Sequence, residues 1–124
     1  MRKIFISLAA TLALCAPAIA APGDMSVATF LTKADALKAK GAMALFSDDM
    51  SLLKQEGTAA GEHYRARLQK ERAAGQPSSC PPKGAKVNSD DLMNFLRKYP
   101  AGSRSGITMK TAIAEFMIAK YPCK

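Results

Sequence analysis

The segment Gln76–Asn88 reads QPSSCPPKGAKVN, and it decides how the chain is organised. Its three prolines and one glycine exclude regular helix or strand over most of its length. A connection this long inside a small domain needs an anchor, and Cys80 lies near its middle. The segment therefore separates one helical region before it from a second helical region after it.

The first helix is predicted to begin after Ser26, a good capping residue, and to end at Gly41. Ala21–Asp24, before it, reads as a turn-like and mobile spacer. The apolar residues follow the three-and-four spacing of one helical face: Val27, Phe30, Leu31, Ala34 and Leu37.

A second helix is predicted from about Asp48 to Ala74, with Ser47 as its cap and an apolar stripe along one face. Gly57 and Gly61 lie inside it, and each costs about 1 kcal/mol relative to alanine. The glycines either let a neighbouring helix approach closely, which is the preferred interpretation, or mark a break between two shorter helices.

Two further helices are predicted after the proline-rich segment. The first begins with Ser89-Asp90-Asp91, which repeats the capping pattern, and stops at Tyr99 because Pro100 disfavours helical geometry in the residue before it. A turn over residues 101–106 leads to the last helix, predicted over Ile107–Lys120. Sustained two-residue alternation and hairpin signals are missing, so we expect an all-α bundle of four to five helices.

Met1–Ala20 is typical of a secretory signal peptide, with a basic start, an apolar run and the small-residue site Ala18-Ile19-Ala20. Residues 21–124 would then form a single domain in the periplasm. Cys15 lies inside this leader, where Leu14 before it disfavours the processing of a lipoprotein. The apolar run is too short to span a bilayer, and no later stretch is long enough, so no transmembrane helix is expected.

Cys80 and Cys123 are the cysteines outside the predicted leader. Export places them where thiols oxidise, so the sequence predicts a disulfide between them. The resulting loop of about 43 residues would stabilise the fold by roughly 4 kcal/mol in the chain-entropy model.

The chain carries 18 Lys and Arg against 10 Asp and Glu, a net charge of +8, and it loses Arg2 and Lys3 with the leader. The remaining charge of +6 favours an acidic partner or an anionic envelope surface, or serves only solubility. Export and the absence of a recognisable nucleic-acid motif argue against nucleic acid. The densest basic run is a candidate partner-binding patch, although its place near the end of the second helix and a solvated helix face explain most of it: Arg65, Arg67, Lys70 and Arg72.

Catalytic chemistry has little support in the sequence. His63 is the single histidine and has no nucleophile placed beside it. The pairs Asp48-Asp49 and Asp90-Asp91 follow serines at helix starts, where capping and the helix dipole account for them. Metal-ligand clusters and phosphate-binding loops are not recognisable. We therefore expect a protein that is not an enzyme and needs no cofactor or metal.

The C-terminal part of the chain contains a distinctive set of residues: Cys80-Pro81, Val87, Leu92, Phe95-Leu96, Tyr99-Pro100, Arg104, Ala112 and Tyr121-Pro122-Cys123. This pattern resembles the Rap/Tai immunity proteins of type VI secretion. The resemblance covers Cys80–Cys123, and its most specific element is the Cys-Pro start joined to a terminal Tyr-Pro-Cys. The first half departs from the family, whose members often carry a further cysteine pair there.

The resemblance implies a small exported helical protein, in many members a homodimer, that neutralises a peptidoglycan-cleaving amidase. Inhibition would then work by occlusion of the amidase cleft by a loop or a helix face. Two alternatives remain open: a periplasmic acid-stress chaperone similar to the HdeA type, and a structural envelope protein.

Overall fold

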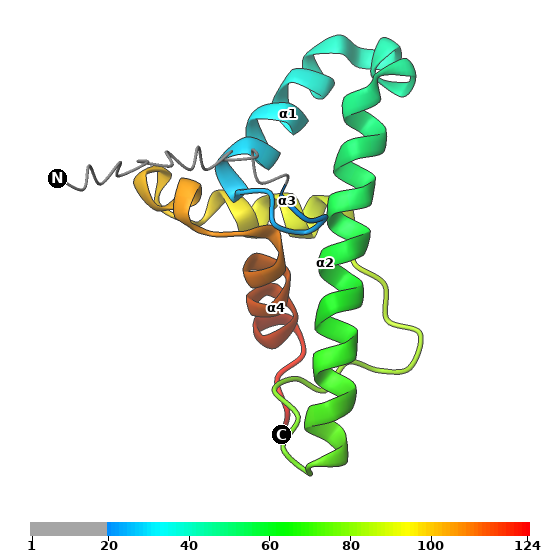
Figure 1. The fold of residues 1–124 in the computed structure, drawn as a ribbon, viewed down its shortest axis with the longest axis vertical. Coiled ribbons are helices and arrows are strands. Elements are labelled where there is room, and N and C mark those ends of the chain that lie inside the picture. Colours follow the sequence, from blue (N-terminus) through cyan, green and yellow to red (C-terminus); the bar gives the residue numbers. More distant parts are fainter. Residues whose placement is uncertain (1–19) are drawn as a thin grey trace, which may run out of the picture.

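The computed structural model describes residues 20–124. Of the predicted signal peptide only Ala20 is included, and Cys15 lies outside the described residues. Four α-helices and two short 3-10 helices make up the fold (Figure 1). In chain order they are α1 (Val27–Lys40), η1 (Gly41–Phe46), α2 (Asp48–Ala73), α3 (Ser89–Arg97), η2 (Ala101–Gly106) and α4 (Met109–Lys120). The predicted all-α class is confirmed, and within the described residues the extended pairing is limited to one isolated bridge between Ser26 and Thr108.

The long helix α2 is the axis of the fold, and α4 packs along its second half (Figure 1). The helix α1 forms a hairpin with the first half of α2, and η1 closes the hairpin at its end. The shorter helix α3 crosses between α1 and α4. All four α-helices contribute to a core whose largest fully buried apolar side chains are Leu96, Met109 and Val27.

Local signals place most helix ends where the sequence predicts them, but α3 ends at Arg97 rather than Tyr99, and α4 begins at Met109 rather than Ile107. The Ser26 and Ser47 hydroxyls accept hydrogen bonds from the first turns of α1 and α2. Gly41 ends α1 at a positive φ of 59°, a conformation that glycine adopts without strain. The cap of α3 is different from the prediction: the Asn88 side chain accepts from Asp90 N and Asp91 N, and Ser89 is the first helical residue.

Two other expectations about local structure are corrected. Residues 101–106 form the 3-10 helix η2 rather than a simple turn. The helix α2 is continuous through Gly57 and Gly61, but no neighbour approaches them, because an added Cβ would meet nothing within 4 Å at either position. Both alternatives for these glycines are therefore wrong.

The spacer before α1 is docked rather than mobile. The backbone N–H groups of Gly23 and Met25 donate to the same Oε2 of buried Glu56, at 2.7 and 3.2 Å. Gly23 O accepts from Lys110 N at 3.0 Å, and the Asp24 carboxylate pairs with Lys110 Nζ at 2.9 Å. Glycine is required at position 23, since φ is 94° and a Cβ would lie 3.3 Å from a backbone nitrogen of α2.

Candidate functional site

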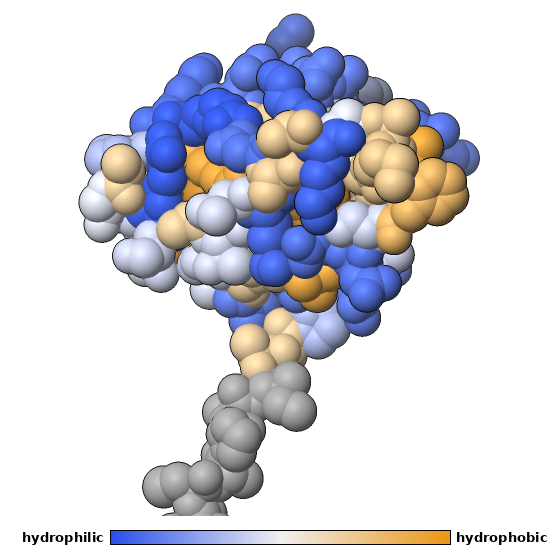
Figure 2. All heavy atoms as spheres, turned by 90° about the horizontal axis from the view of Figure 1, so that it is seen from above, coloured by the Kyte–Doolittle hydropathy of each residue, from blue (hydrophilic) through white to orange (hydrophobic). Residues whose placement is uncertain are grey.

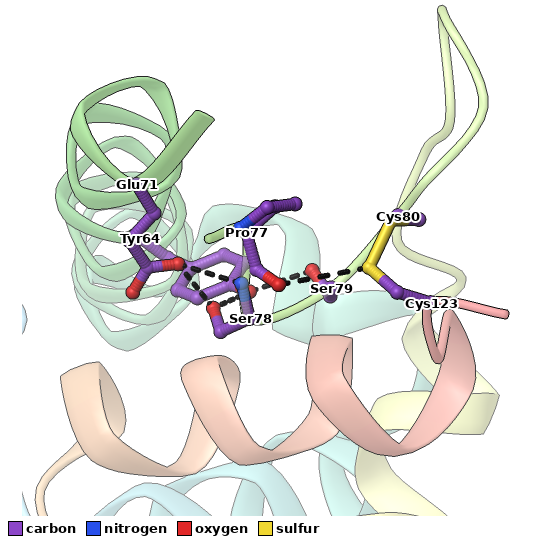
Figure 3. Close-up of a disulfide and its surroundings, with 7 residues drawn as sticks. All are labelled: Tyr64, Glu71, Pro77, Ser78, Ser79, Cys80 and Cys123. Carbon is purple, nitrogen blue, oxygen red and sulfur yellow. Dashed lines mark hydrogen bonds between the residues drawn. A yellow bond between two sulfur atoms is a disulfide. The ribbon is translucent and has the colours of Figure 1, made fainter. Parts of the chain in front are cut away.

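The predicted disulfide is present, and it ties the proline-rich segment to the end of α4 (Figure 3). Cys80 and Cys123 have Cα atoms 5.0 Å apart. The Cys80 N–H donates to Tyr121 O at 2.7 Å, so the two segments are also joined through the backbone. Cys123 Sγ lies 3.6 Å from Pro77 O, a contact without a hydrogen bond because a disulfide sulfur carries no proton.

A chain of hydroxyl groups next to the disulfide fixes the start of the proline-rich segment on α2 (Figure 3). The Tyr64 hydroxyl lies 2.6 Å from Ser79 Oγ and 2.9 Å from Ser78 Oγ. Ser79 is fully buried, and Tyr64 is its side-chain partner. Because an unpaired buried hydroxyl is costly, these bonds hold residues 78 and 79 in one place.

Glu71 continues this network at the end of α2. Its Oε2 accepts from the Ser78 hydroxyl at 2.5 Å and from the Ser78 N–H at 2.9 Å, while Oε1 accepts from Arg67 at 2.6 Å. The hydrogen bonds from Ser78, supported by that from Arg67, lower the pKa of Glu71 to about 2. The carboxylate therefore acts as a structural link between α2 and the disulfide region.

The paired aspartates occupy helix starts. Asp48 and Asp49 lie in the first turn of α2, where Asp49 pairs with Lys33 of α1 at 2.9 Å. Asp90 and Asp91 lie in the first turn of α3, and the hydrogen bond from Lys120 to Asp91, 2.6 Å long, raises the pKa of Lys120. Their position at the positive end of a helix dipole accounts for all four carboxylates, and Asp49 and Asp91 also form ion pairs.

His63 is exposed on α2. Among the described residues, no three His, Cys, Asp or Glu side chains are grouped as metal ligands. That the protein is not an enzyme stays a prediction. In the same part of the chain, no helix combines the length and hydropathy of a membrane span.

The structure divides the predicted basic patch between different faces of α2. Arg65 and Arg72 line a groove beside the proline-rich segment. Arg67 lies on the other flank, paired with Glu71 and 5.7 Å from the centre of the Tyr64 ring. Lys70 is exposed between the two flanks. The four residues therefore do not form one surface, and two of them contribute to a hollow that the sequence did not reveal.

The largest exposed apolar side chains lie at the end of the α1–α2 hairpin. In η1, 68% of Met43, 73% of Leu45 and 84% of Phe46 is exposed. Ala44 is buried between them and anchors the turn, and Ser47 N–H donates to Ala44 O at 3.0 Å. We call Met43, Leu45 and Phe46 the apolar tip. Seen from above, the molecule is mostly hydrophilic, with apolar groups at one edge (Figure 2).

The apolar tip lies between the predicted end of the first helix at Gly41 and the predicted cap of the second at Ser47, so helix periodicity does not single it out. A signal was present in the sequence: Met43-Ala44-Leu45-Phe46 is an unbroken apolar run between the helix-ending Gly41 and the capping Ser47. Connectors are ordinarily polar, so an apolar run of this kind requires either burial or a partner.

A groove of about 820 Å³ runs beside the second half of α2. One wall is α2, the other is the proline-rich segment, and side chains of α4 form part of the floor. A second hollow continues it toward Gly57, and the two share Gly61, Arg65, Val87 and Ile113. The glycines that no neighbour approaches thus border open space along the groove.

Comparison of this chain with protein-family models, with curated proteins and with solved structures gives no match. The resemblance to Rap/Tai immunity proteins therefore stays a prediction.

Proposed function

We propose that this protein is an exported, non-enzymatic binding protein of the immunity type, which inhibits a peptidoglycan amidase of type VI secretion by occluding its cleft. The observation that carries the proposal is the apolar tip, three large apolar side chains held in the open by an ordered turn. The resemblance of the C-terminal part to Rap/Tai proteins supplies the class of partner.

The hairpin suits occlusion because it presents the apolar tip on a braced support. Helix α2 has 26 residues and is about 39 Å long, so its start extends well away from the disulfide end. The ion pair between Lys33 and Asp49 braces the two helices close to the tip. A preorganised apolar projection loses little conformational entropy when it enters a cleft, which favours tight binding.

The test uses the mature protein and purified cell-wall amidases of the type VI class, with hydrolysis of a peptidoglycan suspension as the readout. The wild type should inhibit its cognate amidase at a one-to-one ratio. A Leu45→Ser/Phe46→Ser variant should lose at least about tenfold in affinity, since exposed apolar anchors at interface centres contribute 1–2 kcal/mol or more each. Ile118→Ser is the matched control, because Ile118 is also exposed but lies on α4.

The variants should keep the helical circular dichroism of the wild type, because both substituted tip residues are exposed and do not pack in the core. Equal inhibition by the tip variant and the wild type would contradict the tip as the contact surface. Failure to inhibit any amidase, together with acid unfolding and strong suppression of aggregation near pH 3, would favour the chaperone alternative instead.

A further inference from the structure

We infer that the groove between α2 and the proline-rich segment is a binding site for a single-chain anionic amphiphile, such as a long-chain carboxylate. The inference goes beyond the proposed function and does not depend on it, since it concerns another region of the molecule. It rests on the floor of the groove, the charge of its two walls and the glycines that border it.

The floor of the groove is apolar and offers no free hydrogen-bonding group. It is formed by Tyr64, Leu68, Ile113 and Met117. The Tyr64 hydroxyl is already bonded to Ser78 and Ser79, so the ring alone remains available. An alkyl chain needs nothing more, whereas a peptide laid along the same floor would bring backbone N–H and C=O groups without partners.

The walls carry four cations and no carboxylate. Arg65 and Arg72 come from α2, and Lys83 and Lys86 from the proline-rich segment. Within the part of the chain that the structure describes, none of the four takes part in an ion pair. Positive charge on both sides of an apolar floor attracts an anionic head group and favours it over a neutral or cationic one.

The size of the groove fits a ligand of this class. Its volume of about 820 Å³ lies within the range of pockets that hold small organic molecules. Along α2 it extends from Gly61 to Arg72, a rise of about 16 Å, which gives it the elongated form that an alkyl chain requires.

Gly61 supports the inference independently. Glycine inside a helix is unfavourable by about 1 kcal/mol, yet no neighbouring atom explains its presence at position 61. Gly61 borders both the groove and the adjoining hollow. A side chain there would project into open space at the groove, so the glycine keeps the groove wide.

The test compares ligands that share one tail and differ in the head group: dodecanoate, dodecyl maltoside and dodecyltrimethylammonium, each below its micellar concentration at neutral pH. Acetate serves as the head group without a tail. Calorimetry gives the affinity, and the methyl signals of Met117 and Met43 in proton–carbon correlation spectra report the place of binding. Met43 belongs to the apolar tip and detects adsorption to an exposed apolar surface.

Dodecanoate should bind saturably at one site, shift the Met117 methyl signal and leave that of Met43 in place. Dodecyl maltoside should bind at least about tenfold more weakly, and acetate and the cationic ligand should not bind. Equal affinity for the three tailed ligands, or a shift of Met43 ahead of Met117, would overturn the inference. So would a short acidic peptide that binds the groove more tightly than dodecanoate.

Variants locate the site. Gly61→Phe should abolish binding while it keeps the fold, because it fills open space and improves helix propensity. Arg65→Gln/Arg72→Gln should weaken binding by about tenfold, the combined effect of two exposed ion pairs. Lys70→Gln is the control: it removes one positive charge, where the arginine pair removes two, from the same helix outside the groove. Equal effects of the arginine pair and of the lysine control would refute the assignment.

Discussion

Removal of the Cys80–Cys123 disulfide should cost this domain a large part of its stability. The bond closes a loop with a sequence separation of 43 residues. The chain-entropy model gives about 4 kcal/mol for such a loop, as an upper estimate. In a domain of this size, 1 kcal/mol corresponds to about 4–8 °C in melting temperature, so Cys80→Ser/Cys123→Ser should lower it by up to about 16–32 °C.

The structure indicates that this loss acts mainly through the unfolded chain. Both cysteines are exposed, so serine places no unsatisfied hydroxyl in the core. The backbone hydrogen bond from Cys80 to Tyr121 does not depend on the bridge. The variant should therefore keep the native helical content and lose only resistance to denaturation.

Urea unfolding followed by circular dichroism measures the free energy of unfolding of the oxidised wild type, the reduced wild type and the double serine variant. The last two should agree with each other. A difference below about 1 kcal/mol between oxidised and reduced protein would show that the reasoning about loop closure is wrong, as would reactive thiols in the native protein.

Three further predictions concern α2. Tyr64→Phe should lower the free energy of unfolding by about 1–3 kcal/mol, because it leaves the buried Ser79 hydroxyl without its partner. Urea unfolding measures this loss, and a loss below about 0.5 kcal/mol would contradict the prediction. Glu71 has a folded pKa of about 2, below the unfolded value of about 4.5. Its contribution to the free energy of unfolding is therefore fully present above pH 4.5 and is lost as the pH falls through 2. The stability difference between the wild type and Glu71→Gln should shrink over that window, and a constant difference would refute the assignment. Gly57→Ala and Gly61→Ala should each stabilise the fold by about 1 kcal/mol, since no neighbouring atom lies within 4 Å of either added Cβ. A rise in melting temperature measures this gain, and destabilisation would reveal a close contact.

Much of the fold could be predicted because its signals are local. Ser26 and Ser47 cap helices through hydrogen bonds to residues two or three positions away, and the apolar stripe of α2 repeats along one element. The disulfide followed from the count of cysteines outside the predicted leader. None of these inferences needed knowledge of which segments meet in space.

Some errors are local, such as the cap of α3 and the 3-10 helix η2, but the others involve contacts between distant segments. The spacer before α1 looked mobile, but Glu56, about 30 residues away, binds two of its N–H groups. The division of the basic patch could not be foreseen, because the proline-rich segment returns along one flank of α2 and encloses Arg65 and Arg72 but not Lys70. Sequence spacing places residues on a helix face but does not say which face another segment covers.

The two candidate surfaces coincide with the places where the sequence departs from ordinary folding rules. A connector would normally be polar, yet η1 exposes Leu45 and Phe46. An exposed helix would normally favour alanine over glycine, yet α2 retains Gly57 and Gly61 beside open space. Neither departure stabilises the folded chain, and departures of this kind are expected at sites retained for function. Substitutions that repair them, with polar residues in η1 or alanine in α2, should therefore leave stability equal or higher, while any loss they cause should be confined to binding.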